Sequence, residues 1–554
     1  MSSIAGMSTQ VPLLAYAVAL VALPIFSFLG FYFWATPNSL KDSRRRHLPP
    51  GPRGLPFLGN YLELSKPDTF RFHVQKWARQ YGEIFYTRVG GSDYIWLSSP
   101  RLVKELMDKR SAIYSSRAPT PLAGDTASAG RRQLFMAYGP SYRTPIQDLE
   151  SKQLMYDLLH DPDNFYDHNR RYSSSVVVTA TYGHRIPNWD AEIVKNIYKV
   201  VNNLQSFASP GMWLVDTFPE LRFLPQWMMG NWRSFGQKCF EHDSPIYLKL
   251  WRDLKQEVDE DRANPCFARD FYLSDPAKQG LDELQAAYQT GGLVEAGSET
   301  TSAYQNTFIL MMLQNPAVAR KAQGEIDRVV GSKRLPTWED EKDLPYLRAT
   351  IKELLRTRPP NKIGIQHSTT EDDWFRGLFH PKRHGCVPEL VVSGFRTTRW
   401  CLLIHLLTLA VRSINHDPTH WEKPEEFMPE HYLNHPLTAA AYLNTADPNH
   451  RDHFSYGAGR RVCPGVHLAE KSLFLNIARV LWAFDLSKKV NEKGTVAEPE
   501  AGMMPGWMTI PLPFACDIRC RSEEKAKLIE RTWTEVKKGL EPDGDIPAGY
   551  YRSR

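Results

Sequence analysis

The sequence predicts a mainly α-helical protein with a minor β component, placed behind a single N-terminal transmembrane helix. Three observations lead to this fold class. An uncharged apolar run fills Val11–Ala35, helical patterns of apolar residues dominate from Gln147 onward, and strand-like patterns are confined to short segments such as Ile84–Val89. Helices are therefore expected to make up most of the body that follows the membrane segment.

Composition and charge limit the classes of function that fit this chain. With 554 residues, 42% of them apolar and 12% aromatic, the chain can bury a large core. The net charge is only +6, and Lys41 and Arg44–Arg46 against Asp42 (four minus one) supply +3 of it, so the broad basic face of a nucleic-acid-binding protein is not expected. The seven cysteines are sparse and odd in number, which suits a reducing compartment, and Cys516 and Cys520 are interpreted as ordinary thiols.

The apolar run Val11–Ala35 is long enough to cross a membrane. As a helix it spans roughly 37 Å, against about 30 Å of hydrocarbon. Tyr32 and Trp34 fit an interfacial aromatic belt, and the cluster Arg44–Arg46 is expected on the cytoplasmic side, which puts residues 1–10 in the lumen and the body in the cytoplasm. A cleaved signal peptide is the alternative, but its positive charges would precede the apolar run rather than follow it.

Residues 36–60 are expected to form a basic and proline-rich neck, because the prolines of Pro49–Pro52 prevent a helix and limit conformational freedom. The body is predicted to be one domain over residues 61–533, followed by a polar tail over residues 534–554. Periodicity gives the clearest elements of this body. The helices are Thr69–Tyr81, Pro100–Lys109, Leu281–Leu313 and Tyr346–Thr357, and the strands are Ile84–Val89 and Asp93–Leu97.

The strongest chemical signal is the loop Phe454–Gly465, which reads FSYGAGRRVCPG. Glycines around Cys463, among them Gly457 and Gly465, let the backbone pass close to a flat ligand where a β-carbon would collide. Backbone amides can then donate hydrogen bonds to a thiolate, and Arg461 offers a fixed cation for a carboxylate. For the cysteine taken alone, a buried structural thiol is the alternative.

A second motif, AGSETT at residues 296–301, stands in the middle of the long predicted helix. A glycine inside a helix costs about 1 kcal/mol, which something must offset. Gly297 and Thr300 are three residues apart and are expected to share a helix face, so that a gap opens beside a hydroxyl. A glycine that only packs helices together is the alternative for this motif alone.

A third motif pairs Glu353 with Arg356 on one helix face, which by itself predicts no more than an ordinary ion pair. The later segment Phe427–Tyr432 contains His431 and is a candidate partner of this pair. His367 is either a contact of the bound ligand or an exposed turn histidine.

Taken together and in this order, the motifs resemble the cytochrome P450 family, and the chain is most similar to its fungal microsomal type. The resemblance extends from Pro49 to about Trp533 and implies the cytochrome P450 fold, a haem b cofactor and Cys463 as the axial ligand of the iron. It implies that Glu299 and Thr300 deliver protons as an acid and an alcohol. The cofactor-binding residues that it implies are Cys463, Arg461, Phe454, Tyr456, Gly457, Gly465, Ala296, Gly297 and His367, with Glu353, Arg356 and His431 as a structural ion-pair network.

The chain departs from the family pattern at single residues and over two stretches. Tyr456 replaces the usual phenylalanine, and His431 replaces the usual arginine, so that one leg of the ion-pair network is expected to be neutral at pH 7. About one helix is missing near residues 143–146, and residues 383–410 form an extra stretch that is expected to displace a strand. Both stretches are either errors of the gene model or genuine divergence, and sequencing the transcript separates these alternatives.

The resemblance implies a monooxygenase that inserts one oxygen atom from O2 into a lipophilic small molecule, in secondary metabolism by analogy with fungal members. The sequence shows no glycine-rich dinucleotide fingerprint, so electrons are expected from NADPH through a separate partner, NADPH–cytochrome P450 reductase, at the endoplasmic reticulum membrane. A haem-thiolate isomerase or dehydratase and a catalytically impaired relic of the family are the alternatives.

Overall fold

The computed structural model describes most of the chain from His47 to Tyr550. The predicted transmembrane segment 11–35, residues 1–10 and the basic part of the neck lie outside the described residues. In the part of the chain that is described, no helix combines the length and the apolar character needed to cross a bilayer. The described residues are 47–56, 58–65, 67–89, 92–115, 122, 146–208, 212–217, 219–359, 361, 364–380, 404–443, 445, 447–490, 496, 498–499, 502, 508, 510–547 and 550.

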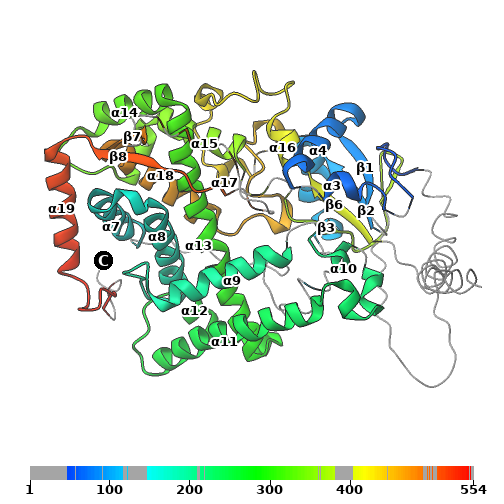
Figure 1. Ribbon diagram of the computed structural model, residues 1–554, viewed down its shortest axis with the longest axis horizontal. Coiled ribbons are helices and arrows are strands. Elements are labelled where there is room, and N and C mark those ends of the chain that lie inside the picture. Colours follow the sequence, from blue (N-terminus) through cyan, green and yellow to red (C-terminus); the bar gives the residue numbers. More distant parts are fainter. Residues whose placement is uncertain are drawn as a thin grey trace, which may run out of the picture.

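A long central helix, α13 (Glu283–Gln314), organises the body. Asp282 caps its first turn through a capping box, and the helix ends ahead of Pro316. It runs through the middle of the molecule and packs against α8 (Phe165–Tyr182) and α11 (Trp232–Asp259) (Figure 1). The other described α-helices, with the π-helix η2, are α3 (Tyr61–Leu64), α4 (Pro67–Tyr81), α5 (Pro100–Val103), η2 (Lys104–Lys109), α6 (Ser111–Tyr114), α7 (Ile146–His160), α9 (Glu192–Ala208), α10 (Leu214–Thr217), α12 (Phe267–Leu273), α14 (Pro316–Val330), α15 (Pro345–Thr357), α16 (Val411–Asn415), α17 (Ala439–Tyr442), α18 (Val466–Ala483) and α19 (Glu523–Lys537).

The largest hydrophobic core lies where α7, α8, α13, α15 and α18 meet. Phe308 from α13, Leu354 from α15 and Leu481 from α18 are among its buried residues. Because α18 follows the predicted cysteine loop directly, the burial of this helix fixes where the loop lies relative to α13.

A four-stranded sheet lies beside the helical body, in the order β1-β2-β6-β3 (Figure 1). Strand β1 (Ile84–Val89) pairs antiparallel with β2 (Ser92–Leu97), and β2 runs parallel to β6 (Ile404–Leu409). The short β3 (His367–Ser368) pairs antiparallel with β6. Two further pairs are β4 (Asp373–Phe375) with β5 (Leu378–His380), and β7 (Phe484–Lys488) with β8 (Cys516–Cys520).

The described elements confirm the mainly α-helical class with a minor β component. The predicted helix Pro100–Lys109 is divided into α5 and η2, whereas the other elements differ from their predicted bounds only at their ends. One expectation was wrong: residues 404–409, which belong to the extra stretch 383–410, do not displace a strand but form β6 itself. This uncharged run satisfies its backbone by pairing with strands on both sides.

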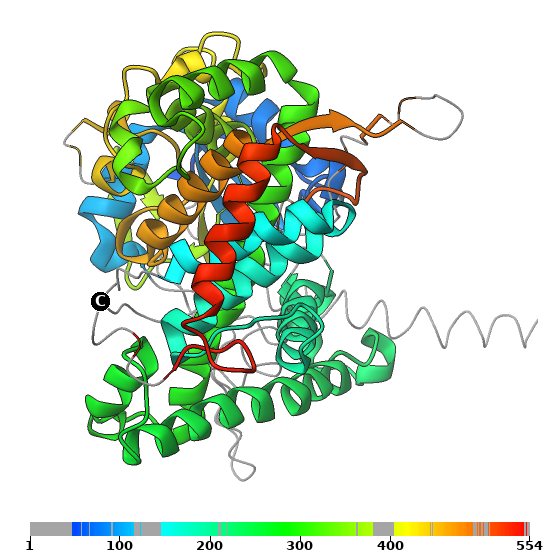
Figure 2. The same ribbon diagram turned by 90° about the vertical axis from the view of Figure 1, so that its left-hand side faces the viewer.

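The C-terminal residues continue the fold instead of forming a separate tail. Helix α19 packs across α7 and faces the viewer in Figure 2, and the chain beyond it turns back so that Ile546 is buried. Asp545 accepts a hydrogen bond from the Arg185 amide at 2.7 Å, and its other carboxylate oxygen lies 2.8 Å from His184 Nδ1. Residues 534–554 therefore include a part of the folded body.

His184 generates a prediction on stability. It lies between Asp545 at 2.8 Å and Glu257 at 2.9 Å, and the two carboxylates raise its pKa to about 10. A raised folded-state pKa stabilises the fold fully below the ordinary value of 6.5, and this contribution is lost as the pH rises through about 10. Because the side chain is partly exposed, we expect His184→Gln to cost about 1 kcal/mol near pH 6 and little near pH 11.

The measurement is the denaturant midpoint of the full chain, compared between variant and wild type at both pH values. His450→Gln serves as the control, because His450 is exposed and lies 3.7 Å from a single carboxylate, that of Asp447. An equal loss of stability at the two pH values would contradict the prediction that the charged form of His184 stabilises the fold.

Candidate functional site

The loop before Cys463 folds through two left-handed glycines. Gly457 has a φ of 73° and Gly459 a φ of 65°, which residues with a β-carbon rarely adopt. A β-carbon on Gly459 would lie 2.1 Å from the carbonyl oxygen of Met107 in η2. The Cys463 amide donates to the Tyr456 carbonyl at 2.8 Å and closes the loop. The loop thus packs tightly on η2 and places the cysteine just ahead of α18.

The Cys463 thiol is partly buried near the start of α18, where Gly465 is the N-cap residue. Burial raises the pKa of the thiol, and a hydrogen bond from the Gly465 backbone opposes that shift. A β-carbon on Gly465 would stand 3.8 Å from the sulfur, an ordinary contact, so no clash within the protein demands glycine there. A partly accessible sulfur with an amide donor is suited to a thiolate ligand of a metal.

Helix α13 presents a small residue to an accessible surface. Helix α13 runs through the middle of the molecule (Figure 1). Ala296 is nevertheless exposed, and Thr300 one turn later is only partly buried. Thr300 Oγ1 donates to the Ala296 carbonyl at 2.9 Å. The space beside the hydroxyl is therefore opened by Ala296.

Gly297 does not face that space, contrary to the prediction. A β-carbon on Gly297 would lie 2.6 Å from the Val177 side chain of α8, and the Gly297 carbonyl accepts from Ser173 Oγ at 2.8 Å. Gly297 is thus the packing glycine that was considered as the alternative. It lets α8 and α13 approach each other closely, which offsets its cost inside the helix.

Glu299 is buried on the side of α13 that faces α8. Its Oε1 lies 3.9 Å from Arg170 of α8, and its Oε2 has no hydrogen-bond partner among the residues described. Burial raises the pKa of Glu299, and Arg170 opposes that shift. The Arg170 guanidinium also stacks over Tyr198 at 5.0 Å. Sequence reasoning missed Arg170, because no spacing relates a residue of α8 to one of α13.

Two residues predicted to contact the bound ligand, Arg461 and His367, meet at one stretch of backbone. Arg461 Nε donates to the Ser115 carbonyl at 3.1 Å, and His367 Nδ1 lies 2.7 Å from the Tyr114 carbonyl. His367 is buried in β3, which excludes the exposed turn histidine considered from the sequence. The fold therefore places an arginine and a histidine on adjacent carbonyls at the end of α6.

The predicted aromatic residues of the loop are buried in different cores. Phe454 packs with residues of α5, η2 and α16, whereas Tyr456 belongs to the main core around α13 and α18. The Tyr456 hydroxyl, which phenylalanine would lack, has no hydrogen-bond partner in the described part of the chain. Burial raises the pKa of Tyr304 on α13, and Cys463 contributes to the shift, so the helix and the thiol lie close together.

Glu353 and Arg356 of α15 form a fully buried ion pair. Arg356 donates to the two carboxylate oxygens of Glu353 at 2.6 and 2.8 Å. Arg356 also donates hydrogen bonds to the carbonyls of Asn415, Pro424 and Glu426. Burial raises the pKa of Glu353, but its hydrogen-bond donors outweigh this effect and hold the pKa below its ordinary value. The pair ties α15 to the segment that leads to the cysteine loop.

His431 is the third member of this network, and the neutral form expected of it at pH 7 stays a prediction. Its Nδ1 lies 3.2 Å from Glu353 Oε1, and its Nε2 lies 2.7 Å from the Glu422 carbonyl. Both ring nitrogens therefore face oxygen atoms, and the tertiary fold supplies the second of them.

Sequence reasoning also missed two charged residues that hold the cysteine loop from outside. Asp108 Oδ1 accepts from the Gly459 amide at 2.7 Å, and Arg451 donates to the Gly457 carbonyl. Each contact fixes one of the two left-handed glycines. A signal was present in the sequence, because a charged pair, Arg451 and Asp452, stands only one residue ahead of the apolar start of the loop.

These residues fit a haem. A partly accessible sulfur with an amide donor provides a metal ligand, the exposed Ala296 on the central helix allows a flat contact, and Arg461 and His367 suit carboxylates. The fold and the site therefore define a haem-thiolate protein. The sequence matches the family model described as cytochrome P450 over residues 49–145, 160–394 and 405–513. The chain belongs to the cytochrome P450 family.

Similar proteins agree with this assignment and carry the activity class in their names. The chain is 39% identical to cytochrome P450 monooxygenase verL of Clonostachys rogersoniana, over 93% of this chain and 94% of that protein. It is 34% identical to cytochrome P450 monooxygenase pgmC of Aspergillus terreus, over 93% and 94%, and 33% identical to virE of Hypocrea virens, over 90% of each. The class of the chain is thus that of the cytochrome P450 monooxygenases, which use a haem iron.

The buried ion pair generates a prediction on folding. Glu353→Gln leaves Arg356 buried without its countercharge, so we expect a loss of about 3–5 kcal/mol in the free energy of unfolding. Protease resistance of the folded fraction across a denaturant series measures this loss. The control is Glu430→Gln, which removes an exposed carboxylate that lies 2.7 Å from Lys321 and should cost less than about 1 kcal/mol. Similar losses from both variants would contradict the prediction.

Proposed function

We propose that this protein inserts one oxygen atom from O2 into a lipophilic small molecule, with haem b held through Cys463. The observation that carries the proposal is the closeness of the thiol to α13: Cys463 packs against the core that contains Tyr304, which lies one turn beyond Thr300. When bound, the haem iron supplies the activation of dioxygen. Arg461 and His367 would hold the carboxylates of the cofactor.

Glu299 and Thr300 are proposed to move protons across α13, from the buried side that faces α8 to the accessible face. The buried Glu299 keeps Oε2 free of partners among the described residues, and its raised pKa favours holding a proton there. Arg170, at 3.9 Å from Oε1, is the charged group that connects Glu299 to α8. The Thr300 hydroxyl donates to its own helix, so its oxygen can still accept a hydrogen bond on the accessible side.

Electrons are proposed to come from NADPH through a separate NADPH–cytochrome P450 reductase, because the sequence shows no dinucleotide fingerprint. A place in secondary metabolism is proposed from the similarity to the named fungal monooxygenases.

The protein is proposed to be a single-pass protein of the endoplasmic reticulum membrane with a cytoplasmic body. Two features support this: the uncharged run Val11–Ala35 followed by Arg44–Arg46, and the exposed apolar residues Leu62 on α3 and Leu214 on α10, at one end of the molecule (Figure 1). In intact microsomes, external protease should digest a C-terminal tag and spare an N-terminal one. The reverse pattern would refute this orientation.

Replacement of Cys463 tests the proposed function. The purified wild-type protein should show the red-shifted carbon monoxide spectrum of a thiolate-bound ferrous haem and should consume NADPH when reductase is added. Cys463→Ala should lose the spectrum, whereas Cys520→Ala, a change at a partly buried cysteine in β8, should retain it. A spectrum without NADPH consumption would favour an isomerase or an impaired relic. An unchanged spectrum in Cys463→Ala would refute the assignment of Cys463 as the ligand of the haem iron.

Replacement of Thr300 tests proton delivery. We expect Thr300→Ala to lower product formed per NADPH by about 100-fold, because the hydroxyl on the accessible face is lost while the haem spectrum is kept. Thr307→Ala is a matched control: its hydroxyl donates to the carbonyl of Ala303 at 2.7 Å, in the same way as Thr300, but is buried in the core. An equal effect of the two variants would show that only helix stability is involved.

A further inference from the structure

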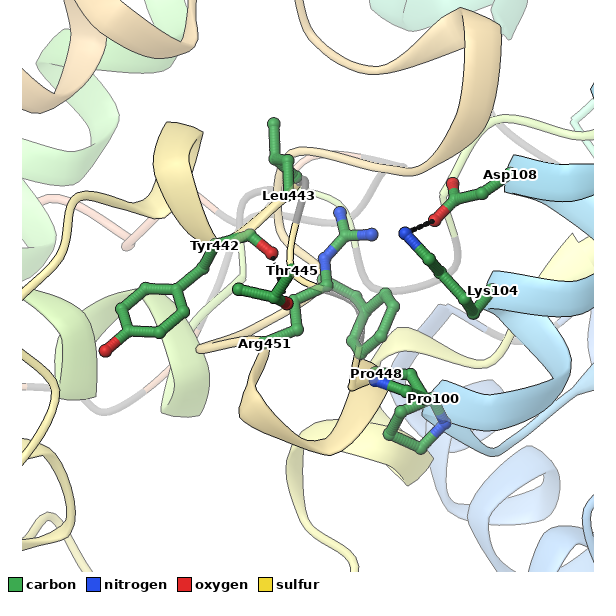
Figure 3. Close-up of a pocket in the computed structure, with 9 residues that line it drawn as sticks. Pro100, Lys104, Asp108, Tyr442, Leu443, Thr445, Pro448 and Arg451 are labelled. Atoms are coloured by element: carbon green, nitrogen blue, oxygen red, sulfur yellow. Dashed lines mark hydrogen bonds and ion pairs between the residues drawn. The ribbon is translucent and has the colours of Figure 1, made fainter.

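A surface hollow lies between η2 and the segment that precedes the cysteine loop. Lys104 and Asp108 of η2 line one side of it, and Tyr442 and Arg451 line the other (Figure 3). Phe454 is a further lining residue. None of these residues takes part in the proposed oxygen chemistry. Two of them, Asp108 and Arg451, bind the backbone of the cysteine loop.

Arg451 is the unusual residue of this hollow. Its side chain is only 7% exposed and stacks over the Phe454 ring at 4.3 Å. One guanidinium nitrogen donates to the Gly457 carbonyl, whereas Nε is buried and has no hydrogen-bond partner among the residues that the structure describes. A buried arginine usually has a carboxylate partner, because an uncompensated charge is costly away from water.

The nearest carboxylates are already engaged by other groups. Asp108 lies 3.4 Å from the Lys104 ammonium and accepts the Gly459 amide. Asp452 lies 2.7 Å from Lys352 and 3.1 Å from His435 Nδ1. Within the described ranges, Arg451 therefore forms no ion pair of its own, and burial lowers its pKa to about 10 although Asp108 and Asp452 oppose the shift.

Lys104 and Arg451 point toward each other across the hollow, with Asp108 on the Lys104 side (Figure 3). Two cations that face each other with one carboxylate leave a net positive charge of one, which an anion between them would neutralise. Arginine presents a planar fork of donors that matches two oxygens of an oxyanion, and lysine adds a point charge. We propose that the hollow binds a small inorganic oxyanion of the phosphate class, held by Arg451 from within and by Lys104 from the rim.

A bound oxyanion would connect η2 to the cysteine loop. Arg451 donates to the Gly457 carbonyl. Lys104 forms an ion pair with Asp108, which accepts from the Gly459 amide. The two cations that would bind the anion are therefore linked to both left-handed glycines. Binding of the oxyanion is therefore expected to stabilise the cysteine loop against unfolding, and this effect should saturate as the oxyanion concentration rises.

Calorimetric titration of the full-length protein with inorganic phosphate tests the proposal, with chloride used to keep the ionic strength constant. We expect saturable binding at one site, and at least about a tenfold loss of affinity in Lys104→Gln and in Arg451→Lys. The control is Lys109→Gln, which removes an equal charge from the same helix; Lys109 is exposed, lies 2.9 Å from Glu105 and does not line the hollow. Lys109→Gln should bind phosphate as the wild type does.

Because Arg451→Lys can disturb the loop, Lys104→Gln at the rim decides the outcome. Lack of phosphate binding by the wild type, equal affinities in Lys104→Gln and Lys109→Gln, or chloride competing with the same affinity as phosphate would each overturn the proposal. The titration needs no turnover, so its result is independent of the proposed monooxygenase reaction.

Discussion

A fully buried ion pair between a carboxylate and a guanidinium holds the segment that leads to the cysteine loop. Glu353 and Arg356 neutralise each other, but a buried pair is tolerated only when its remaining donors and acceptors are also satisfied. Arg356 meets this requirement by binding three carbonyls of the segment that leads to the cysteine loop, and Glu353 by accepting from His431 and from the Met428 amide. The position of Cys463 thus depends on a charge network that never touches it.

The central helix has two different sides. On one side Gly297 lets α8 approach, and Glu299 is buried against Arg170. On the other side Ala296 and Thr300 remain accessible. The close packing of the first side holds α13 in place, and this rigidity lets a small residue and a hydroxyl stand at a fixed position facing the site. Helix packing and the proposed proton delivery therefore share one short sequence, AGSETT, and Glu299 belongs to both.

The cysteine loop is fixed from both of its sides by different kinds of force. Apolar packing holds Tyr456 in the core shared with α13 and α18, and the charged Asp108 and Arg451 hold the backbone of Gly457 and Gly459 from outside. The left-handed glycines alone would leave a loop of high conformational freedom. Burial on one side and directional hydrogen bonds on the other restrict it to a single shape.

The sequence by itself determined the features that depend on neighbours within one turn or one loop. These are the α-helical class, the long helix around residues 296–301, the glycine pattern around Cys463 and the spacing of Glu353 and Arg356. The tertiary structure alone decided which partners these residues meet: Arg170 for Glu299, Val177 for Gly297, a second acceptor for His431, and β6 within a stretch that had been expected to displace a strand. The physical reason is that local spacing fixes the direction of a side chain only relative to its own element, whereas its partner comes from an element distant in the sequence, brought there by the packing of the whole core.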